Sequence, residues 1–272
     1  MDRKAVFLDV DGTLVGWDLQ IPRSAEEACK KAKEAGHRLC VATGRAHYVI
    51  GEDILSLGFD GVISAGGARI DLQGETIFQN RFTPQVLAHI IGFFESRGIG
   101  CTFERSQCLL ASPKVFDYFQ RKQSPFQDLI QTYIQLEQVI QGPLSAELED
   151  VGKVIFCDAG NLSLEAIRRE FSGECDVVQC SMPFYGRNSG EMSPAGINKG
   201  RAVEQVLSHW GISKENSIAI GDGDNDLSMF HCCGHGVAMG NGDPGLKKAA
   251  EWVTDTLEND GVAKAFRHYG LV

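Results

Sequence analysis

The sequence of 272 residues lacks an apolar run that approaches the roughly 18 to 20 residues of a membrane-spanning helix. It also lacks a recognisable secretory signal, because a strand-like segment begins at residue 5 with no longer apolar core and no small-residue cleavage site. Internal repeats and low-complexity segments are absent as well. We therefore expect a cytoplasmic protein that has no membrane partner.

Excess positive charge is absent too. The formal net charge is −10, and no cluster of Lys and Arg resembles a basic patch. Nucleic acids and anionic membranes attract their partners through long-range positive potential, so neither is expected to bind here. A small anionic substrate stays compatible with this charge, because one metal ion and one or two cationic side chains can hold it locally. The oligomeric state is not readable from the sequence.

The nine cysteines are odd in number, and no regular spacing relates them. Cys40 and Cys157 each lie in or directly after a run of apolar residues. A free buried thiol behaves as a small apolar side chain. We expect most of these cysteines to be reduced residues of the core.

Strands and helices alternate at both ends of the chain. The first part contains short apolar runs at 5–10, 38–42 and 61–64, separated by helical patterns at 22–35 and 46–57 and followed by a hairpin at 68–79. The alternation resumes at 198 with a helix to about 209, strands at 217–220 and 236–239, and a helix near 243–250. Strand–helix–strand repetition predicts a parallel sheet with right-handed crossovers.

The composition changes between these two parts. Helix-like segments are found at 84–96, 113–122 and 161–171, and strand-like segments at 99–104, 107–111, 152–157 and 175–180. No catalytic-looking motif lies among them. The predicted fold is α/β: a doubly wound, Rossmann-like parallel sheet core formed by residues 1–82 and 188–272, with an inserted α+β cap domain at 83–187.

Polar residues cluster where strands of the predicted core end, or beside those ends. These clusters are Asp9 with Asp11, Thr43, Lys199, and the segment 222–226. In an open parallel sheet, ligands bind beyond the carboxyl ends of the strands. We therefore expect the four clusters to form one site.

Two carboxylates, Asp9 and Asp11, lie two residues apart as an apolar strand gives way to a turn. Gly12 can adopt backbone angles that let successive N–H groups point inward and bind an anion. The bare pair is also compatible with an Asx-type turn or with the metal site of a sugar-nucleotide transferase. The longer string at 6–14, VFLDVDGTL, is far more specific and favours a functional site.

The segment 221–226, GDGDND, supplies three more carboxylates after another strand. At about 4 Å and an effective dielectric near 20, each pair of like charges costs roughly 4 kcal/mol, so the cluster needs a cation or protons. Oxygen ligands beside a substrate phosphate favour Mg²⁺. A calcium EF-hand loop would need Gly at its sixth position, and Leu227 is found there.

A cation and a hydroxyl complete the predicted site. Lys199 begins a helix, where a positive charge does not favour the helix dipole, so we expect an anionic partner for it. Thr43 and Gly44 offer a hydroxyl and backbone N–H groups to a phosphate oxygen. Thr43 is equally suited to be the N-cap of the following helix.

Together the four clusters resemble those of the haloacid dehalogenase superfamily, in the same order. The position of the insert is similar to that of the superfamily's Cof-type phosphatases, subclass IIB, which carry a cap of C2B type. The segments 191–200, EMSPAGINKG, and 236–241, GVAMGN, also look like stretches of that family. The resemblance covers nearly the whole chain. It implies a Mg²⁺-dependent phosphatase that acts on a small phosphorylated metabolite, such as a sugar phosphate or a phosphorylated cofactor.

The resemblance also implies roles for individual residues. Asp9 would be the nucleophile, and Asp11 the general acid and base. Mg²⁺ would be bound by Asp9, by the backbone carbonyl of Asp11, and by Asp222. The phosphate would be held by Thr43, Gly44, Lys199 and Asn225, while Asp226 would orient Lys199 or a metal-bound water.

One position departs from the family's pattern. Where such proteins commonly carry Asn-Gly-Ala, this chain has Gly66-Gly67-Ala68, so any substrate contact from that Asn is missing or supplied elsewhere. Arg45, Arg187 and Asn188 are candidates for recognition of the substrate, on the ground of their nearness to the cap hinge.

Two other functions fit the same residues. A phosphomutase shares the nucleophile and differs in returning the phosphate to a second hydroxyl group. A non-catalytic protein that binds phosphorylated metabolites would tolerate the loss of Asp9 or Asp11, and both are present here. The leaving group of the substrate is not readable from the sequence.

Overall fold

The computed structural model describes residues 3–16, 18–121, 137–139, 148–180 and 182–272. The chain divides into two compact units. The first contains residues 1–45, 50–78 and 198–272, and the second contains residues 46–49 and 79–197. Parts of the predicted insert, at 122–136 and 140–147, lie outside the described residues.

The first unit is built on an eight-stranded sheet with the strand order β14-β13-β12-β1-β2-β3-β4-β5. The pairs from β14 to β3 are parallel, and β4 turns back antiparallel to β3. The strands are β1 (Ala5–Leu8), β2 (Arg38–Ala42), β3 (Gly61–Ser64), β4 (Arg69–Leu72), β5 (Glu75–Gln79), β12 (Ser217–Gly221), β13 (His235–Ala238) and β14 (Trp252–Val253). The predicted α/β core with a parallel sheet is confirmed.

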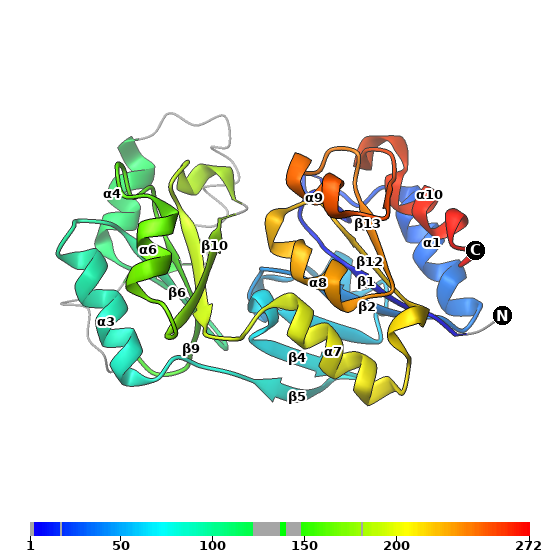
Figure 1. Cartoon of the computed structure of the whole chain (residues 1–272), viewed down its shortest axis with the longest axis horizontal. Helices are drawn as coiled ribbons and strands as arrows, with labels where there is room; N and C mark the ends of the chain where they lie inside the picture. The colour runs from blue at the N-terminus through cyan, green and yellow to red at the C-terminus, as the bar shows by residue number, and fades with distance from the viewer. Residues whose placement is uncertain (1–2, 17, 122–136, 140–147, 181) are drawn as a thin grey trace. The chain divides into compact units, whose positions relative to one another are not determined.

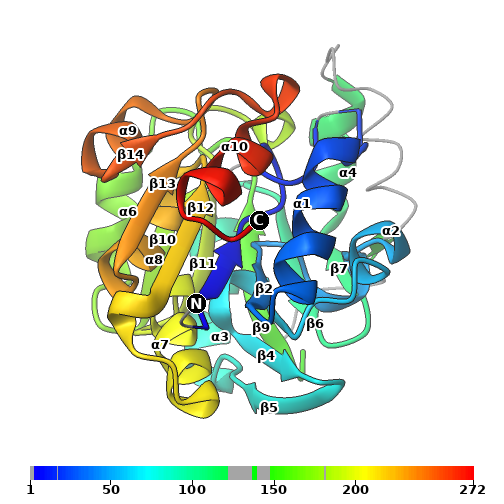
Figure 2. The ribbon, with the colours of Figure 1, turned by 90° about the vertical axis from the view of Figure 1, so that its right-hand side faces the viewer.

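Helices cover both faces of this sheet (Figure 1). They are α1 (Arg23–Glu34), α2 (Glu52–Leu55), α7 (Lys199–Trp210), α8 (Leu227–Cys232), α9 (Pro244–Ala249) and α10 (Gly261–His268). Figure 2 looks onto the side where α1 and α10 lie over the strands. On that face Val6 and Leu8 of β1 join the core of α1 and α10, whereas Phe7 points to the opposite core of α7 and α8. The alternation of side chains along a strand thus gives β1 two buried faces.

The second unit contains a six-stranded sheet with the order β10-β11-β9-β6-β7-β8. Its strands are β6 (Cys101–Arg105), β7 (Leu109–Ala111), β8 (Glu137–Val139), β9 (Val151–Phe156), β10 (Cys175–Gln179) and β11 (Gly190–Pro194), and its helices are α3 (Pro84–Glu95), α4 (Pro113–Arg121) and α6 (Leu164–Glu170). Val154 and Phe156 of β9 pack with α3 and α6, while Ile155 packs with α4 on the other face. This mixed sheet with its helices is the α+β arrangement expected of the insert.

A buried ion cluster lies within the second sheet. The ammonium of Lys153 on β9 lies 3.2 Å from a carboxylate oxygen of Glu104 on β6 and 3.1 Å from one of Glu191 on β11. All three side chains are buried. Burial by itself lowers the pKa of Lys153, but the two carboxylates outweigh it and raise that pKa above its ordinary value. The three strands are thereby joined by charge as well as by backbone hydrogen bonds.

One prediction of local structure is wrong, and one strand lies where none was predicted. The single helix expected at 46–57 is replaced by the 3-10 turn η1 (His47–Val49) and the one-turn helix α2, because Gly51 between them has the extended angles φ −65° and ψ 152°. The segment 190–194 was not expected to be a strand, yet it forms β11 between β10 and β9. Strand propensity is low in GEMSP, and pairing on both sides overrides it.

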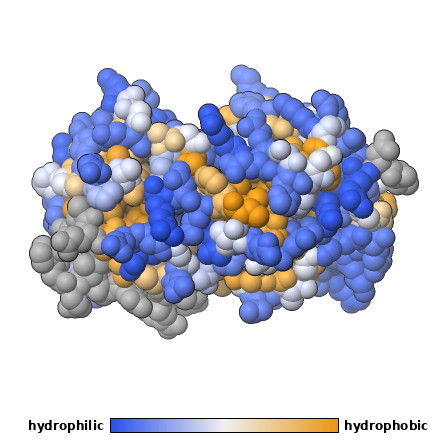
Figure 3. All heavy atoms as spheres, turned by 90° about the horizontal axis from the view of Figure 1, so that it is seen from below, coloured by the Kyte–Doolittle hydropathy of each residue, from blue (hydrophilic) through white to orange (hydrophobic). Residues whose placement is uncertain are grey.

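Other features of the described residues agree with the sequence. Cys108 and Cys232 are partly exposed, and the other seven cysteines are buried, with no disulfide formed. Burial raises the pKa of the Cys29 thiol to about 12, so it behaves as an apolar core residue. No described helix has the length and apolar character needed to cross a membrane. Hydrophilic residues cover most of the surface that Figure 3 shows.

Candidate active site

The candidate site lies at one edge of the first sheet, where three adjacent parallel strands end. Asp9 follows β1, Thr43 follows β2 and Asp222 follows β12, and β1 lies between the other two strands. The backbone N–H of Asp9 donates to the carbonyl of Ile220 (3.0 Å), which ties the first of these ends to the third. Parallel pairing therefore brings together carboxylates that are more than two hundred residues apart.

The loop after β1 is fixed by its own backbone. The carbonyl of Val10 accepts hydrogen bonds from the N–H groups of Thr13, Leu14 and Val15 at 3.2, 2.9 and 2.8 Å. Gly12 has φ +86°, and a Cβ atom there would collide with the carboxylate of Asp222. Glycine is thus required at this position both for its backbone angles and for the close approach of the two loops.

Lys199 lies at the centre of the acidic residues. Its Nζ is 2.6 Å from Oδ1 of Asp9 and 2.6 Å from Oδ1 of Asp226, and the three side chains are 1%, 6% and 0% exposed. Lys199 is the first residue of α7, whose N-cap Asn198 accepts from the N–H of Arg201 (3.0 Å). The cap fixes the start of the helix, and the helix start places the ammonium between the two carboxylates.

Both carboxylate oxygens of Asp226 accept hydrogen bonds. Oδ1 accepts from Lys199, and Oδ2 accepts from the backbone N–H groups of Asp222 and Gly223, each at 3.0 Å. Asp222 itself accepts a long hydrogen bond from the hydroxyl of Thr13 (3.4 Å). Asp226 therefore holds the loop and the lysine, while Asp222 keeps oxygen lone pairs that a cation can use.

Negative charge exceeds positive charge in this buried group. Burial is the main cause that raises the pKa of Asp9 well above its ordinary value; Asp226 and Asp222 add to it, and Lys199 opposes it. The same causes, led by burial and then Asp226, raise the pKa of Asp222 to about 7. Burial alone would lower the pKa of Lys199, but Asp226 and Asp9 raise it above its usual value. Lys199 therefore stays protonated beside the three acids.

The acids can hold a metal ion. Carboxylate oxygens of Asp9, Asp222 and Asp226 lie within 4.8 Å of one another. Because Asp226 has both oxygens engaged, Asp9 and Asp222 are the better side-chain ligands. An all-oxygen donor set with excess negative charge suits a hard divalent cation, and binding one would remove the need for Asp9 and Asp222 to take up protons.

Asp11 lies beside this group with a different partner. Its two carboxylate oxygens accept from Nε and Nη2 of Arg45 at 2.9 and 2.6 Å. The sequence had indicated Arg45 as a substrate contact; the structure places its guanidinium on the carboxylate of Asp11.

Thr43 and Gly44 follow β2 at the same edge of the sheet. Thr43 is fully buried, and its hydroxyl oxygen accepts from the N–H of Arg45 (3.0 Å). This local turn is the capping type of contact that the sequence left open for Thr43. Gly44 is partly exposed, as is Asn225 in the loop after β12.

The departure at Gly66 falls in a left-handed turn after β3. Ala65, Gly66 and Gly67 have φ angles of 50°, 66° and 106°. The N–H of Gly66 donates to the carbonyl of Thr43 (3.0 Å), and a Cβ on Gly67 would collide with the carbonyl of Asn198. Nothing lies within 4 Å of a Cβ built on Gly66, so this position has room for a side chain.

The two remaining specificity candidates belong to the second unit. The carbonyl of Arg187 accepts from the side chain of Gln179 at 3.0 Å, and the side-chain amide of Asn188 donates to the carbonyl of Gly160. Both residues thus take part in local contacts of their own unit.

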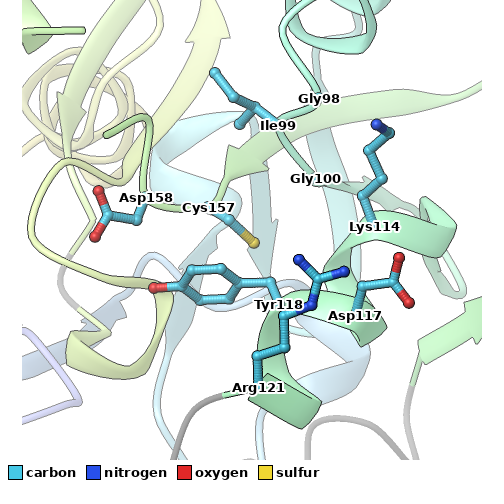
Figure 4. A pocket seen from close by; sticks show the side chains of 9 residues that line it. All are labelled: Gly98, Ile99, Gly100, Lys114, Asp117, Tyr118, Arg121, Cys157 and Asp158. Atoms are coloured by element: carbon cyan, nitrogen blue, oxygen red, sulfur yellow. The ribbon is translucent and has the colours of Figure 1, made fainter. Parts of the chain in front are cut away.

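A cavity of about 360 Å³ also lies within the second unit (Figure 4). Its charged lining consists of Lys114, Asp117 and Arg121 from α4 and Asp158 after β9. Two positive and two negative side chains give no net attraction for a phosphate group.

Comparison with known proteins decides the family. The model of the haloacid dehalogenase-like hydrolases matches residues 6–266. The chain belongs to this family. The enzyme is thus a haloacid dehalogenase-type phosphatase, and its match to a solved subclass IIB structure supports the Cof-type assignment.

Individual relatives of the hydrolase cover almost its full length. The 5-amino-6-(5-phospho-D-ribitylamino)uracil phosphatase YwtE of Bacillus subtilis is 27% identical, with 96% of each chain covered. The solved structure of the subclass IIB sugar phosphatase BT4131 has a TM-score of 0.81 at 25% identity and covers 99% of this chain and all of its own. A haloacid dehalogenase-like hydrolase from B. subtilis gives a TM-score of 0.84 at 25% identity, with 97% and 99% covered.

Sequence reasoning missed one residue that shapes the site of this hydrolase. The side-chain amide of Asn241 donates to the carbonyl of Gly12 (2.7 Å), and its oxygen accepts from the N–H of Leu257 (3.0 Å). Asn241 thereby ties the loop after β1 to the C-terminal part of the chain. The only signal was its place in the segment 236–241, which resembles the family without naming a role.

Proposed function

We propose that this phosphatase hydrolyses the phosphate ester of a small metabolite through an aspartyl-phosphate on Asp9, with Mg²⁺ as its cofactor. The observation that carries the proposal is the state of the Asp9 carboxylate. It is buried, one oxygen is held 2.6 Å from Lys199, and the described hydrogen bonds leave its other oxygen unoccupied. A fixed carboxylate with one unoccupied oxygen is suited to attack phosphorus.

The proposed metal site uses Asp9, Asp222 and the backbone carbonyl of Asp11. When bound there, Mg²⁺ would neutralise charge and orient the phosphate. The fit rests on the donor chemistry: all ligands are oxygens, and the buried acids carry more negative charge than Lys199 balances. Asp226 stays outside the ligand set because its oxygens hold Lys199 and the loop.

The chemistry assigned to the protein's own residues has two steps. In the first, Oδ2 of Asp9 bonds to phosphorus as the ester P–O bond breaks, and Asp11 gives its proton to the departing oxygen. In the second, a water attacks the phosphorus, Asp11 takes the water's proton, and the bond to Asp9 breaks to release phosphate. Lys199, Thr43, Gly44 and Asn225 would hold the phosphate oxygens in both steps.

The names of two relatives support the proposed substrate class. One is named for a phosphorylated ribitylamino-uracil and another for sugar phosphates. We therefore propose a phosphorylated sugar, polyol or cofactor precursor as the substrate, and we propose no nucleic-acid or membrane partner. The cytoplasm is the proposed location. A phosphomutase stays the nearest alternative activity, and release of free phosphate distinguishes the two.

The test is a screen for phosphate release across a panel of phosphorylated metabolites with Mg²⁺, ranked by kcat/KM. Asp9→Asn should abolish turnover, and Asp11→Asn should lower the rate by roughly 10² to 10⁴-fold on an alkyl phosphate. Asp224→Asn is the matched control, because Asp224 is an exposed carboxylate of the same loop as Asp222. More than a few per cent of activity in folded Asp9→Asn would contradict the nucleophile, and transfer of phosphate to a second hydroxyl group would favour the mutase.

A further inference from the structure

Arg45 holds the carboxylate of Asp11 in a fork. Nε donates to Oδ2 at 2.9 Å and Nη2 donates to Oδ1 at 2.6 Å, and the two side chains are only 12% and 30% exposed. Two parallel N–H···O bonds fix the orientation of the carboxylate plane, which a single donor does not. The carboxylate of Asp11 therefore has a fixed direction in the structure.

Backbone hydrogen bonds fix the two segments that carry Arg45 and Asp11. The N–H of Arg45 donates to the hydroxyl of Thr43 (3.0 Å), and its carbonyl accepts from the N–H of Ala65 (2.7 Å). On the other side, the N–H of Gly12 donates to the carbonyl of Val15 (2.9 Å) directly after Asp11. The ends of β2 and β3 thus hold the arginine, and the loop after β1 holds the acid.

Three described side chains donate hydrogen bonds to the four acids of the site: Lys199, Thr13 and Arg45. Asp9 and Asp226 share Lys199, and Asp222 accepts from Thr13. For the carboxylate of Asp11, the described hydrogen bonds all come from Arg45. The guanidinium is therefore the group that sets where the oxygens of Asp11 lie.

We propose that Arg45 is the positioning residue of Asp11, and this inference rests on the proposed function, in which Asp11 is the acid and base. A proton is transferred only when the two heavy atoms come within about 2.6 to 3.2 Å, so the direction of the carboxylate matters. The fork leaves room for this transfer. A carboxylate offers about four lone-pair sites, and the two N–H groups use two of them.

The test compares two leaving groups in Arg45→Gln. The burst of the first turnover is measured with p-nitrophenyl phosphate, whose leaving group needs little protonation, and with the best alkyl phosphate of the wild-type enzyme. A misplaced acid should lower the burst rate on the alkyl ester roughly 10²-fold with the apparent KM of the burst nearly unchanged, and should lower the burst rate on the aryl ester less than threefold. Arg45→Lys, which keeps the charge without the fork, should restore only part of the alkyl rate.

Arg69 provides the matched control. It makes a similar fork on Asp71 of the same strand, with distances of 2.7 and 2.9 Å. Arg69→Gln removes the same kind of ion pair from the same unit, so its loss of stability should resemble that of Arg45→Gln. Both of its rates should stay near those of the wild type. An equal loss on both esters in Arg45→Gln, or a rise in KM alone, would overturn the positioning role and favour a substrate contact.

A second measurement separates this inference from the proposed function. Urea unfolding of Arg45→Gln, Asp11→Asn and the double variant reports on the ion pair without turnover. If the wild-type enzyme releases phosphate from no ester, the proposed function fails. In that case, midpoint shifts that are not additive would still support Arg45 as the holder of Asp11. Additive shifts would show that the fork does not form, and would refute the inference whatever the activity.

Discussion

If Asp9 and Asp222 bind Mg²⁺ as proposed, withdrawing the metal should destabilise the phosphatase far more at pH 8 than at pH 5. In the metal-free protein, burial and Asp226 raise the pKa of Asp222 from 3.8 to about 7. An acid whose pKa is raised on folding binds its proton more tightly in the folded state. Its stabilising contribution is complete below about pH 4 and is lost as the pH rises through 7.

The magnitude follows from the two pKa values. A rise from 3.8 to about 7 corresponds to about 4 kcal/mol of lost stability above pH 7 in the absence of metal. A cation bound at Asp222 and Asp9 keeps both carboxylates ionised and offsets this loss. At Mg²⁺ about 100-fold above its dissociation constant, the gain is roughly 2.7 kcal/mol, or about 5 to 10 °C in Tm.

Protons compete with the metal at lower pH. Because Asp222, with its pKa of about 7, must lose its proton to bind Mg²⁺, the apparent affinity should fall about 100-fold between pH 8 and pH 5. The same Mg²⁺ concentration is then close to the dissociation constant, and the gain shrinks to about 0.4 kcal/mol. The shift in Tm should therefore nearly vanish at pH 5.

The assay is thermal unfolding followed by circular dichroism, with EDTA or Mg²⁺, at about pH 5 and pH 8. Asp222→Asn should remove the shift, and Asp224→Asn, which changes an exposed carboxylate of the same loop, should keep it. A shift of equal size at both pH values would refute the reasoning from the buried acids. So would a full shift in Asp222→Asn.

Two further predictions concern the stability of the site. Lys199→Met leaves Asp9 and Asp226 buried without their cation, so urea unfolding should show a loss of roughly 3 to 5 kcal/mol. The half-exposed pair of Lys264 and Asp255 provides the control: Lys264→Met should lower the urea midpoint much less than Lys199→Met, and equal losses would contradict the role of burial. Gly67→Ala should cost roughly 1 to 3 kcal/mol because of its φ of 106° and the collision with Asn198, whereas Gly66→Asn should be nearly neutral at φ 66° in open space. A reversed order in urea midpoints would count against this reading of the turn.

The sequence predicts the sheet of the first unit well because its strands are short apolar runs that end in polar turns. β1, β2 and β12 lie close to their expected bounds for this reason. Predictions fail where local pattern and tertiary pairing disagree. The helical periodicity at 46–57 gives no sign of the extended backbone angles of Gly51. Strand β11 forms because β10 and β9 pair with it on both sides.

The sequence predicts which residues form the candidate site, but not which of their side chains contact each other. Motifs identify Asp9 and Asp222, which follow strands whose ends meet in a parallel sheet, and Lys199, which begins a helix beside them. They do not reveal that Arg45 pairs with Asp11, because the two are 34 residues apart and lie on different loops. Ion pairs of this kind depend on side-chain directions that only the packed loops determine.

The four aspartates of the site differ in the hydrogen bonds that they accept, and therefore in the roles that suit them. Asp226 accepts from Lys199 and from two backbone N–H groups, so both of its oxygens hold other parts of the site. Asp11 is turned onto Arg45, outside the Asp9–Asp222–Asp226 cluster, and is left with lone pairs for a proton.

Within the described part of the chain, Asp9 shares the lysine and keeps one oxygen without a hydrogen bond, and the carboxylate of Asp222 accepts only the long bond from Thr13. An acid held firmly at one oxygen is suited to be a nucleophile, and an acid with weakly bound oxygens is suited to be a metal ligand. We infer that the division of labour among these acids depends on the placement of two cations. If Lys199 contacted Asp11 and Arg45 contacted Asp9, the roles of these two acids would change even if every carboxylate kept its position.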